Sequence, residues 1–191
     1  MKKEYITTNS RQTQRLGELL AEELRGGGVI CLTGELGSGK TTFAQGMLKG
    51  LGAKGPHTSP TFVVVKHYKK KYPISNIPAC AEASAGRQYP NKSQTTKSKN
   101  QKKYQIPDTK YQIQNIYHID CYRVEPKGIL DLGWNEIIAG KSNIVIVEWA
   151  EKVKRIVPKG AVWVKFEHIK GDKRKINVKA KSEKLKCKSK N

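Results

Sequence analysis

The chain has 191 residues, of which 37 are Lys or Arg and 16 are Asp or Glu, so its formal net charge is +21. This length suits one domain with a well-formed core, or one small domain with appendages. No apolar run approaches the roughly 20 residues that cross a bilayer, and the N-terminus lacks the hydrophobic region of a secretory signal. The scattered cysteines, at positions 31, 80, 121 and 187, argue against a disulfide framework or structural zinc and favour the reducing cytoplasm.

The first elements in chain order are a strand, a helix and a second strand. Residues Lys3–Thr8 are rich in β-branched and aromatic residues, which predicts a short strand. Asn9 and Ser10 are candidate N-caps for an amphipathic helix that ends at Gly26–Gly28. The run Val29–Leu32 is apolar on both faces, as expected of a central parallel strand.

The stretch Gly34–Thr42 has the pattern G-x-x-x-x-G-K-[ST] between that strand and a predicted helix over Phe43–Leu51. Its glycines permit backbone angles that let main-chain N–H groups close around an anion. The start of the helix at Lys40 adds the positive end of a dipole. Lys40 would reach the terminal phosphates and Thr41 would ligate magnesium, so the loop predicts a nucleoside triphosphate site. The alternative is a chance match in a glycine-rich turn.

A hydroxyl-rich loop, His57–Thr61, comes next, and then a predicted strand over Phe62–Tyr68. Switch segments of nucleotide-dependent proteins occur in this position, and Thr61 would there contact the γ-phosphate or its metal. The alternative is an ordinary turn fixed by Pro60.

Two peripheral segments carry most of the excess charge. Residues 69–115 hold ten Lys or Arg and two acids, and residues 168–191 hold the same numbers. The first segment is rich in Pro, Ser, Asn, Gln and Lys without apolar periodicity, which predicts a disordered insertion in a hairpin. These segments either attract phosphate backbones or are solvated tails, and the composition leaves both open.

The second half of the chain predicts two strands that end in acids. Ile116–Arg123 carries Asp120 near its end, where a Walker B acid would hold magnesium and a solvated acid is the alternative. A helical segment over Glu125–Ile138 breaks at Gly133. The apolar run Ile144–Val147 predicts a buried parallel strand that brings Glu148 and Trp149 to the ligand-binding edge of the sheet.

At this edge Glu148 would orient the attacking water, and Trp149 would stack on a base or cap the core. A hairpin is predicted next, with strands over Ala161–Ile169 and Lys175–Val178. A lysine-rich tail completes the chain.

Four motifs in this order resemble the bacterial TsaE (YjeE) family of P-loop ATPases: residues 34–43, Ser59–Phe62, Tyr117–Arg123 and Val147–Lys152. The resemblance covers roughly residues 3–68 and 116–180. It implies an α/β, P-loop NTPase-like three-layer sandwich, with a mostly parallel central sheet and antiparallel edge strands. The expected organisation is one ATPase domain over residues 1–180, interrupted by the insertion 69–115 and followed by a basic tail over 181–191.

The resemblance implies an ATPase that is weak alone and works with TsaD and TsaB. Together these proteins install threonylcarbamoyl on the adenosine next to the anticodon of ANN-decoding tRNAs. The implied cofactors are ATP and Mg²⁺. The implied catalytic residues are Lys40, Asp120 and Glu148, and the implied metal-binding residues are Thr41, Asp120 and Glu148. The implied nucleotide-binding residues are Glu35, Leu36, Gly37, Ser38, Gly39, Lys40, Thr41, Thr42, Thr61 and Trp149.

The sequence departs from the family pattern at the insertion, at Trp134 and in the basic tail, away from the nucleotide residues. The competing functions are a small-molecule or nucleotide kinase and a basic tRNA-binding module with a nucleotide switch. The insertion contains a single arginine, Arg87, whereas a kinase lid usually contacts the transferred phosphate with several arginines, which argues against a kinase. A guanine-specific switch lacks its Asn-Lys-x-Asp element, because Asn91-Lys92 precedes Ser93-Gln94.

Overall fold

A computed structural model describes residues 2–24, 27–73 and 111–180. The chain divides into two units, Met1–Lys70 with Gln114–Asn191, and Lys71–Ile113. The first unit contains the glycine-rich loop together with Asp120 and Glu148. The disordered insertion predicted over residues 69–115 is wrong at its two ends, because residues 69–73 lie in strand β3 (Val65–Pro73) and residues 111–115 in strand β4 (Tyr111–Asp120). The rest of it, residues 74–110, and the basic tail, 181–191, lie outside the described residues.

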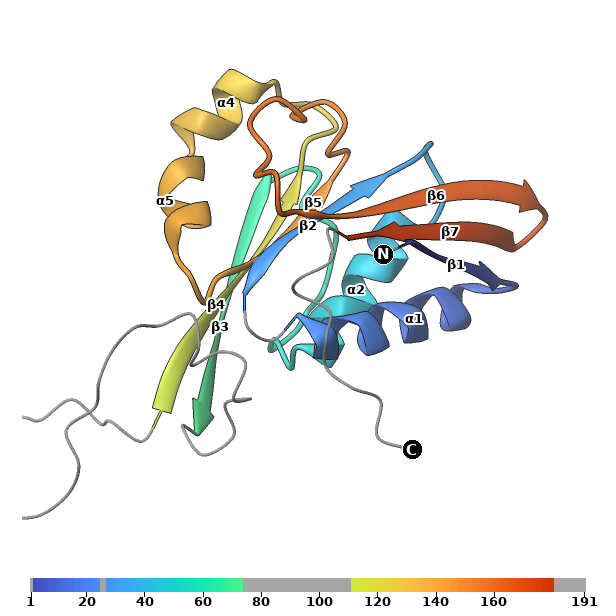
Figure 1. The fold of residues 1–191 in the computed structure, drawn as a ribbon, viewed down its shortest axis with the longest axis horizontal. Helices are drawn as coiled ribbons and strands as arrows, with labels where there is room; N and C mark the ends of the chain where they lie inside the picture. Colours follow the sequence, from blue (N-terminus) through green and yellow to red (C-terminus); the bar gives the residue numbers. More distant parts are fainter. Residues whose placement is uncertain (1, 25–26, 74–110, 181–191) are drawn as a thin grey trace, which may run out of the picture. The chain divides into compact units, whose positions relative to one another are not determined.

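One mixed sheet runs through the described chain, in the strand order β1-β7-β6-β2-β5-β4-β3 (Figure 1). Strands β6, β2, β5 and β4 are parallel neighbours, whereas β1 and β6 both pair with β7 in the antiparallel sense. This arrangement confirms the predicted parallel centre and antiparallel edge. The strands are β1 (Lys2–Thr7), β2 (Gly28–Thr33), β3 (Val65–Pro73), β4 (Tyr111–Asp120), β5 (Ile144–Glu148), β6 (Val162–Lys170) and β7 (Lys173–Lys179).

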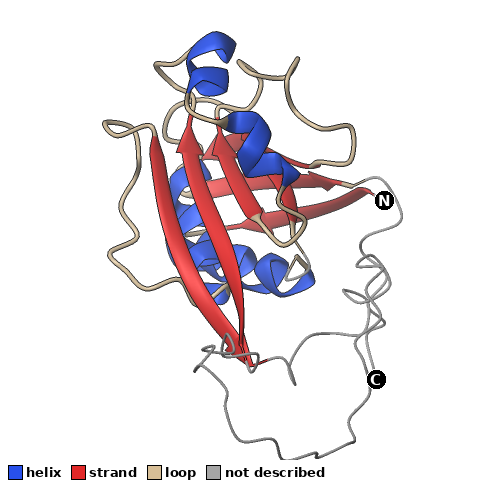
Figure 2. Ribbon diagram, turned by 90° about the vertical axis from the view of Figure 1, so that its left-hand side faces the viewer, coloured by secondary structure: helices blue, strands red, loops and turns tan. Residues whose placement is uncertain are grey.

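The helices cover the sheet on both faces, as the three-layer prediction requires. Figure 2 shows them on opposite sides of the strands. A first core contains Phe43, Leu48 and Ile146 beneath α1 and α2, and a second contains Ile129 and Val147 beneath α4 and α5. The helices are α1 (Ser10–Glu23), α2 (Lys40–Gly50), α4 (Pro126–Asp131) and α5 (Trp134–Ala139). No helix in the described ranges is long and apolar enough to cross a membrane.

Local sequence explains where several of these elements begin. The Asn9 side chain accepts a hydrogen bond from the Gln12 amide at 2.9 Å and so caps α1, as predicted. Cys31 and Cys121 are free and fully buried in the second core, so they pack as small hydrophobic residues. Burial also raises the pKa of the Cys121 thiol to about 12. Cys80 and Cys187 lie outside the described residues.

Trp134, which departs from the family pattern, is an interior residue with 1% of its surface exposed. Its indole Nε1 donates to the Ile156 carbonyl oxygen at 3.0 Å, so its polar atom is satisfied. The helical segment breaks before it, as predicted, because Gly133 has a φ of 82°. The unusual tryptophan therefore fills the second core rather than the nucleotide site.

Two predicted strands have wrong boundaries. The strand expected from Phe62 begins at Val65, because residues 61–63 form a turn in which Phe62 is 87% and Val63 59% exposed. Val64 has a φ of 63°, which a strand residue cannot adopt. The strand expected from Ile116 begins at Tyr111, and β3 continues to Pro73. The ends of these strands are polar, so they lack the apolar alternation from which a strand is predicted. They still form strands, because backbone pairing does not require that alternation.

Parallel pairing brings the ends of β2, β5 and β4 to the same edge of the sheet. Leu32 pairs with Glu148 between β2 and β5, and Asp120 pairs with Glu148 between β4 and β5. Because these strands run in one direction, their carboxyl ends meet at one edge, where ligands bind in open α/β sheets. The phosphate-loop pattern starts directly after β2 at the same edge.

Candidate functional site

The loop between β2 and α2 needs glycine at its two ends. Gly34 has a φ of 136° and Gly39 a φ of 103°, both unfavourable for residues with a Cβ. A Cβ on Gly34 would lie 2.4 Å from the Phe166 carbonyl oxygen, and one on Gly39 would lie 3.1 Å from Arg174 Cδ. The tight backbone that the sequence predicts here is therefore present.

Lys40 begins α2 and turns back into the loop. Its Nζ donates to the carbonyl oxygens of Gly34 and Glu35, each at 2.8 Å. The same atom lies 3.7 Å from the centroid of the Trp149 ring. Burial lowers the pKa of the Lys40 ammonium, and the nearby carboxylates, chiefly that of Glu148, partly oppose this shift. The ammonium is therefore desolvated and held where an anion in the loop would meet it.

Glu148, at the end of β5, is 1% exposed and contacts two side chains. Its Oε2 accepts a hydrogen bond from the Thr41 hydroxyl at 2.7 Å. Its Oε1 lies 2.8 Å from Nε2 of His118, which is fully buried on β4. A carboxylate oxygen accepts, so Nε2 is the donor in this bond. Among the described residues, His118 Nδ1 has no hydrogen-bond partner.

Asp120, at the end of β4, forms hydrogen bonds with the loop before β3. Its Oδ2 accepts from the Thr61 hydroxyl at 2.5 Å, and its Oδ1 accepts from the Tyr122 amide at 2.8 Å. Its own amide donates to the Val64 carbonyl oxygen at 2.9 Å. The strained φ at Val64 therefore lies in the segment that presents Thr61 to this carboxylate.

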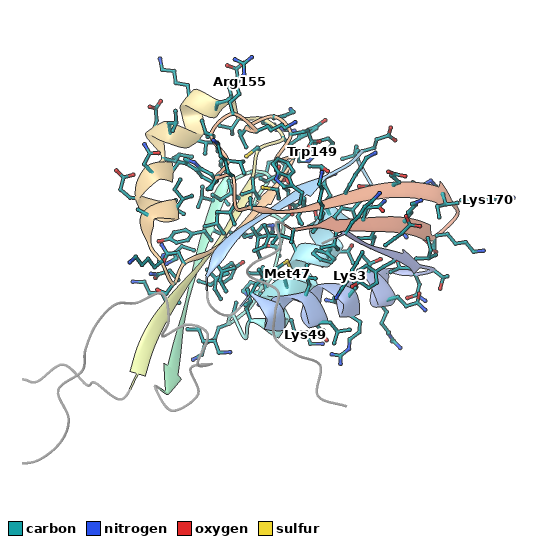
Figure 3. The ribbon with its side chains drawn as sticks, viewed as in Figure 1. Lys3, Met47, Lys49, Trp149, Arg155 and Lys170 are labelled. Carbon is teal, nitrogen blue, oxygen red and sulfur yellow. The ribbon has the colours of Figure 1, made fainter. Side chains whose placement is uncertain are left out.

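Trp149 is the first residue after β5 and lies at this edge of the sheet (Figure 3). Its φ is 57°, and a left-handed conformation at a residue other than glycine costs roughly 1–3 kcal/mol. Its ring contacts that of Tyr122, with the centroids 4.9 Å apart. The strained backbone directs the indole towards Lys40 and Tyr122.

The groups at this edge fit a magnesium-bound triphosphate. Magnesium prefers oxygen ligands and is usually held by one or two carboxylates together with substrate phosphates. The Thr41 hydroxyl and the carboxylates of Asp120 and Glu148 are oxygen groups of this kind. The buried Ser38 hydroxyl has no hydrogen-bond partner among the described residues, and a phosphate oxygen in the loop would supply one.

Comparison with known proteins gives the family. The model of the family described as "Threonylcarbamoyl adenosine biosynthesis protein TsaE" matches residues 7–77 and 100–176. The chain belongs to the TsaE family. The crystal structure of Bacillus subtilis YdiB has a similar fold, with a TM-score of 0.61 and 23% identity over 94% of this chain and 86% of that one.

Three curated relatives share the name tRNA threonylcarbamoyladenosine biosynthesis protein TsaE. The Nostoc sp. protein is 34% identical over 151 residues, which are 76% of this chain and 66% of that protein. The Aquifex aeolicus protein is 30% identical over 92% of this chain and 95% of its own length. The Bacillus subtilis protein is 26% identical over 92% and 84%, respectively.

The structure brings the main residues predicted from the TsaE resemblance to one edge of the sheet. Thr41 contacts Glu148, and Thr61 contacts Asp120. Within the loop, Leu36 is 79% exposed and Ser38 only 1%. The apolar side chain of Leu36 points to solvent, so only its backbone N–H could bind a phosphate, whereas Ser38 has a buried hydroxyl within the loop. The phosphate contacts of Glu35, Gly37, Gly39 and Thr42 stay predictions.

Sequence reasoning gave no role to two residues at this TsaE site. His118 shares a strand face with Asp120, but its contact with Glu148 depends on the pairing of β4 with β5. Arg174 reaches Gly39 from β7, and no local pattern indicates this approach. Alternation along β4 places His118 on the same face as Asp120, which is a partial indication that it belongs to the site. No feature of the sequence gives a similar indication for Arg174.

Proposed function

We propose that this chain binds magnesium-ATP in the loop Gly34–Thr42 and hydrolyses it in support of tRNA threonylcarbamoylation. The observation that carries this proposal is the contact of Thr41 with Glu148 at the start of α2, beside the buried Lys40. A hydroxyl, a carboxylate and an ammonium at a helix N-terminus are the groups that phosphoryl transfer requires. The names of the TsaE relatives support the pathway. The proposed compartment is the cytoplasm, with which the free thiols of Cys31 and Cys121 agree.

In this proposal Lys40 binds the β- and γ-phosphate oxygens of ATP. Its ammonium exchanges the carbonyl oxygens of Gly34 and Glu35 for the phosphate oxygens. Because burial has already removed water from the ammonium, little solvent has to reorganise when the charge of the transition state develops. The N-terminus of α2 adds its dipole to the same charge.

Thr41, Asp120 and Glu148 are the residues that would hold magnesium. The bound ion supplies neutralisation of the β/γ oxygens. The same acids also have roles of their own. Glu148 accepts a hydrogen bond from the attacking water, while His118 fixes the orientation of its carboxylate. Asp120 also accepts a hydrogen bond from Thr61, so the conformation of the loop before β3 would depend on whether ATP, ADP or no nucleotide is bound.

We further propose that TsaD and TsaB stimulate ATP hydrolysis by this chain, and that the hydrolysis supports turnover of their complex. The loops around the site expose large apolar side chains, with Leu36 79% and Phe62 87% exposed. We propose that these two side chains become buried when a partner protein binds, because burial of exposed apolar surface drives association. The full adenosine modification, next to the anticodon of ANN-decoding tRNAs, then belongs to the assembly rather than to this chain alone.

The test is phosphate release from ATP, measured with the chain alone and with TsaB and TsaD present. Lys40→Ala should abolish ATP binding. Glu148→Gln should keep ATP binding and lower the rate about 100-fold, as expected for loss of a general base. GTP serves as the competing nucleotide. Full stimulated activity in both variants, or preference for GTP, would contradict the proposal.

A further inference from the structure

A hollow of about 720 Å³ lies beside the proposed nucleotide site on the β6 side of the sheet. Trp163 and Trp149 both line it. In β6, Val162 and Val164 belong to the core beneath α1 and α2, so Trp163 between them lies on the opposite face. Figure 1 shows β6 and β7 extending away from α4 and α5. Trp163 is half-buried, because it packs against the second core and also lines the hollow.

The hollow is distinct from the phosphate-binding part of the loop. Its described lining includes Gly34 and Glu35 at the start of the loop, but no residue from 37 to 42. The helix that begins at Lys40 packs on the other face of the sheet. The two sites therefore adjoin at Trp149 and Glu35, and of the phosphate loop only its start, Gly34 and Glu35, lines the hollow.

Lysines surround the two tryptophans. Lys154, Lys159, Lys165 and Lys179 line the hollow and are exposed, against two carboxylates, those of Glu35 and Glu151. Lys165 pairs with Glu167 at 2.8 Å. Within the described ranges, no carboxylate lies within ion-pair distance of the other three lysines. The rim is therefore net positive, and three of its charges are not neutralised by ion pairs.

The basic surface continues past the hollow along β1 and β7. A neighbouring hollow of about 460 Å³ shares Trp163, Lys165 and Lys179 and adds Lys2 and Lys175 along β1 and β7. Its lining also includes Glu167 and Glu4, and Glu4 pairs with Lys175 at 3.0 Å, so Lys2 is the lysine it adds without an ion pair among the described residues. In the sequence, the eleven residues after Ala180 add five lysines and one glutamate. A lysine-rich surface of this extent attracts a polyanion.

We propose that this hollow binds an unpaired nucleotide of single-stranded RNA. The base stacks on Trp163, and the adjoining phosphates contact Lys159 and Lys179. Proteins bind single strands by combining a basic groove with aromatic side chains on which bases stack. Unpaired bases in loops are also how RNA is usually recognised. An acidic peptide would satisfy the lysines but leave the indole without a stacking partner.

The inference goes beyond the proposed ATP hydrolysis and can fail separately from it. The test uses the full-length protein and a fluorescent single-stranded RNA of about 12 nucleotides, the size of a typical single-strand site. Fluorescence anisotropy gives its affinity at several salt concentrations. Trp163→Ala should weaken binding about ten-fold or more, whereas Trp163→Phe, which keeps a stacking ring, should stay within about three-fold.

A charge variant supports the test if the tryptophan variant folds poorly. Lys159→Ala with Lys179→Ala should reduce the slope of log affinity against log salt by about 1.4, the value for two phosphate contacts. The matched control removes two exposed lysines elsewhere, Lys127 and Lys141, and should leave the slope unchanged. ATP hydrolysis should be unaffected by Trp163→Ala. If the wild type binds RNA but does not hydrolyse ATP, the RNA site stands and the proposed function fails.

Four results would overturn the RNA site. The first is unchanged RNA affinity in Trp163→Ala and in the paired lysine variant. The second is equal affinity for the same sequence as a duplex, which would show charge attraction without stacking. The third is equally effective competition by polyglutamate, which would point to an acidic peptide. The fourth is loss of ATP affinity instead of RNA affinity in Trp163→Ala, which would assign the hollow to the base of the triphosphate.

Discussion

Oε1 of Glu148 lies 2.8 Å from Nε2 of His118, and both side chains are almost completely buried. The second carboxylate oxygen meets Thr41 at 2.7 Å. Two strands and the first turn of α2 thus fix one acid at the edge of the sheet. Because β4 holds His118 in place, the Glu148 carboxylate is oriented before any nucleotide arrives. We infer that His118 positions Glu148 rather than contacting ATP.

His118→Gln and His118→Asn separate this positioning role from packing. A glutamine amide places its nitrogen near Nε2 and keeps the bond to Glu148, whereas an asparagine amide reaches only the Nδ1 position. We expect His118→Asn to lower stimulated ATP hydrolysis about ten-fold or more, and His118→Gln to recover much of it. Rates are compared per folded protein, with ATP affinity measured alongside. Equal rates in the two variants would show that the contact does not matter for hydrolysis.

Lys40 makes stability depend on pH in a predictable direction. Burial lowers the folded-state pKa of Lys40 below its ordinary value of 10.5, so at alkaline pH the unfolded chain holds a proton that the folded chain has released. Stability rises with pH where the unfolded state binds more protons. The free energy of unfolding of the wild type, relative to Lys40→Met, should therefore increase from neutral pH towards 10.5. Urea unfolding of both proteins measures this, and a constant or falling difference would contradict the burial of the charge.

The bond between Thr61 and Asp120 should restrain the loop before β3. Thr61→Val keeps the shape of the side chain and removes the hydroxyl, whereas Thr61→Ser keeps the hydroxyl. Hydrogen bonds to charged groups contribute about 1.5–3 kcal/mol, so the amides of residues 58, 59 and 61–64 should exchange about ten-fold faster in Thr61→Val. Hydrogen–deuterium exchange without nucleotide measures this. Equal exchange in the valine and serine variants would show that another contact holds the loop.

Trp134 should contribute strongly to stability and only indirectly to the site. Trp134→Ala opens a cavity in the second core and should cost about 3–5 kcal/mol in the free energy of unfolding. Trp134→Phe, which also loses the bond to Ile156, should cost less. Leu132→Ala on the same segment is the control, because Leu132 is 51% exposed and should lose under about 0.5 kcal/mol. Similar losses in the alanine variants at 132 and 134 would contradict the interior placement of the tryptophan.

Local patterns were sufficient to predict the strands and helices that form the site. The glycine spacing before Lys40 predicted a strand, a tight loop and a helix, because few backbones other than a phosphate loop need that pattern. The apolar run Ile144–Val147 predicted a buried strand that presents Glu148 at its end. These predictions concern residues that are close in sequence or strands whose burial dictates their composition.

Contacts across the sheet were not predictable in the same way. His118 and Glu148 meet because β4 and β5 are parallel neighbours in one register, and Arg174 approaches Gly39 from a distant hairpin. Phe62 and Val63 have strand-like composition but are exposed in a turn. Their surroundings, rather than their intrinsic preference, decide their conformation.

The most direct test of the proposed function is formation of threonylcarbamoyladenosine on an ANN-decoding tRNA by TsaB and TsaD, with this chain added. Product is measured over many turnovers with wild type, Glu148→Gln or Trp134→Phe, the last as a control away from the site. We predict sustained product formation with wild type and the control, and little with Glu148→Gln although it binds ATP. Equal product formation with Glu148→Gln, or without the added chain, would contradict the claim that ATP hydrolysis at this site supports the modification.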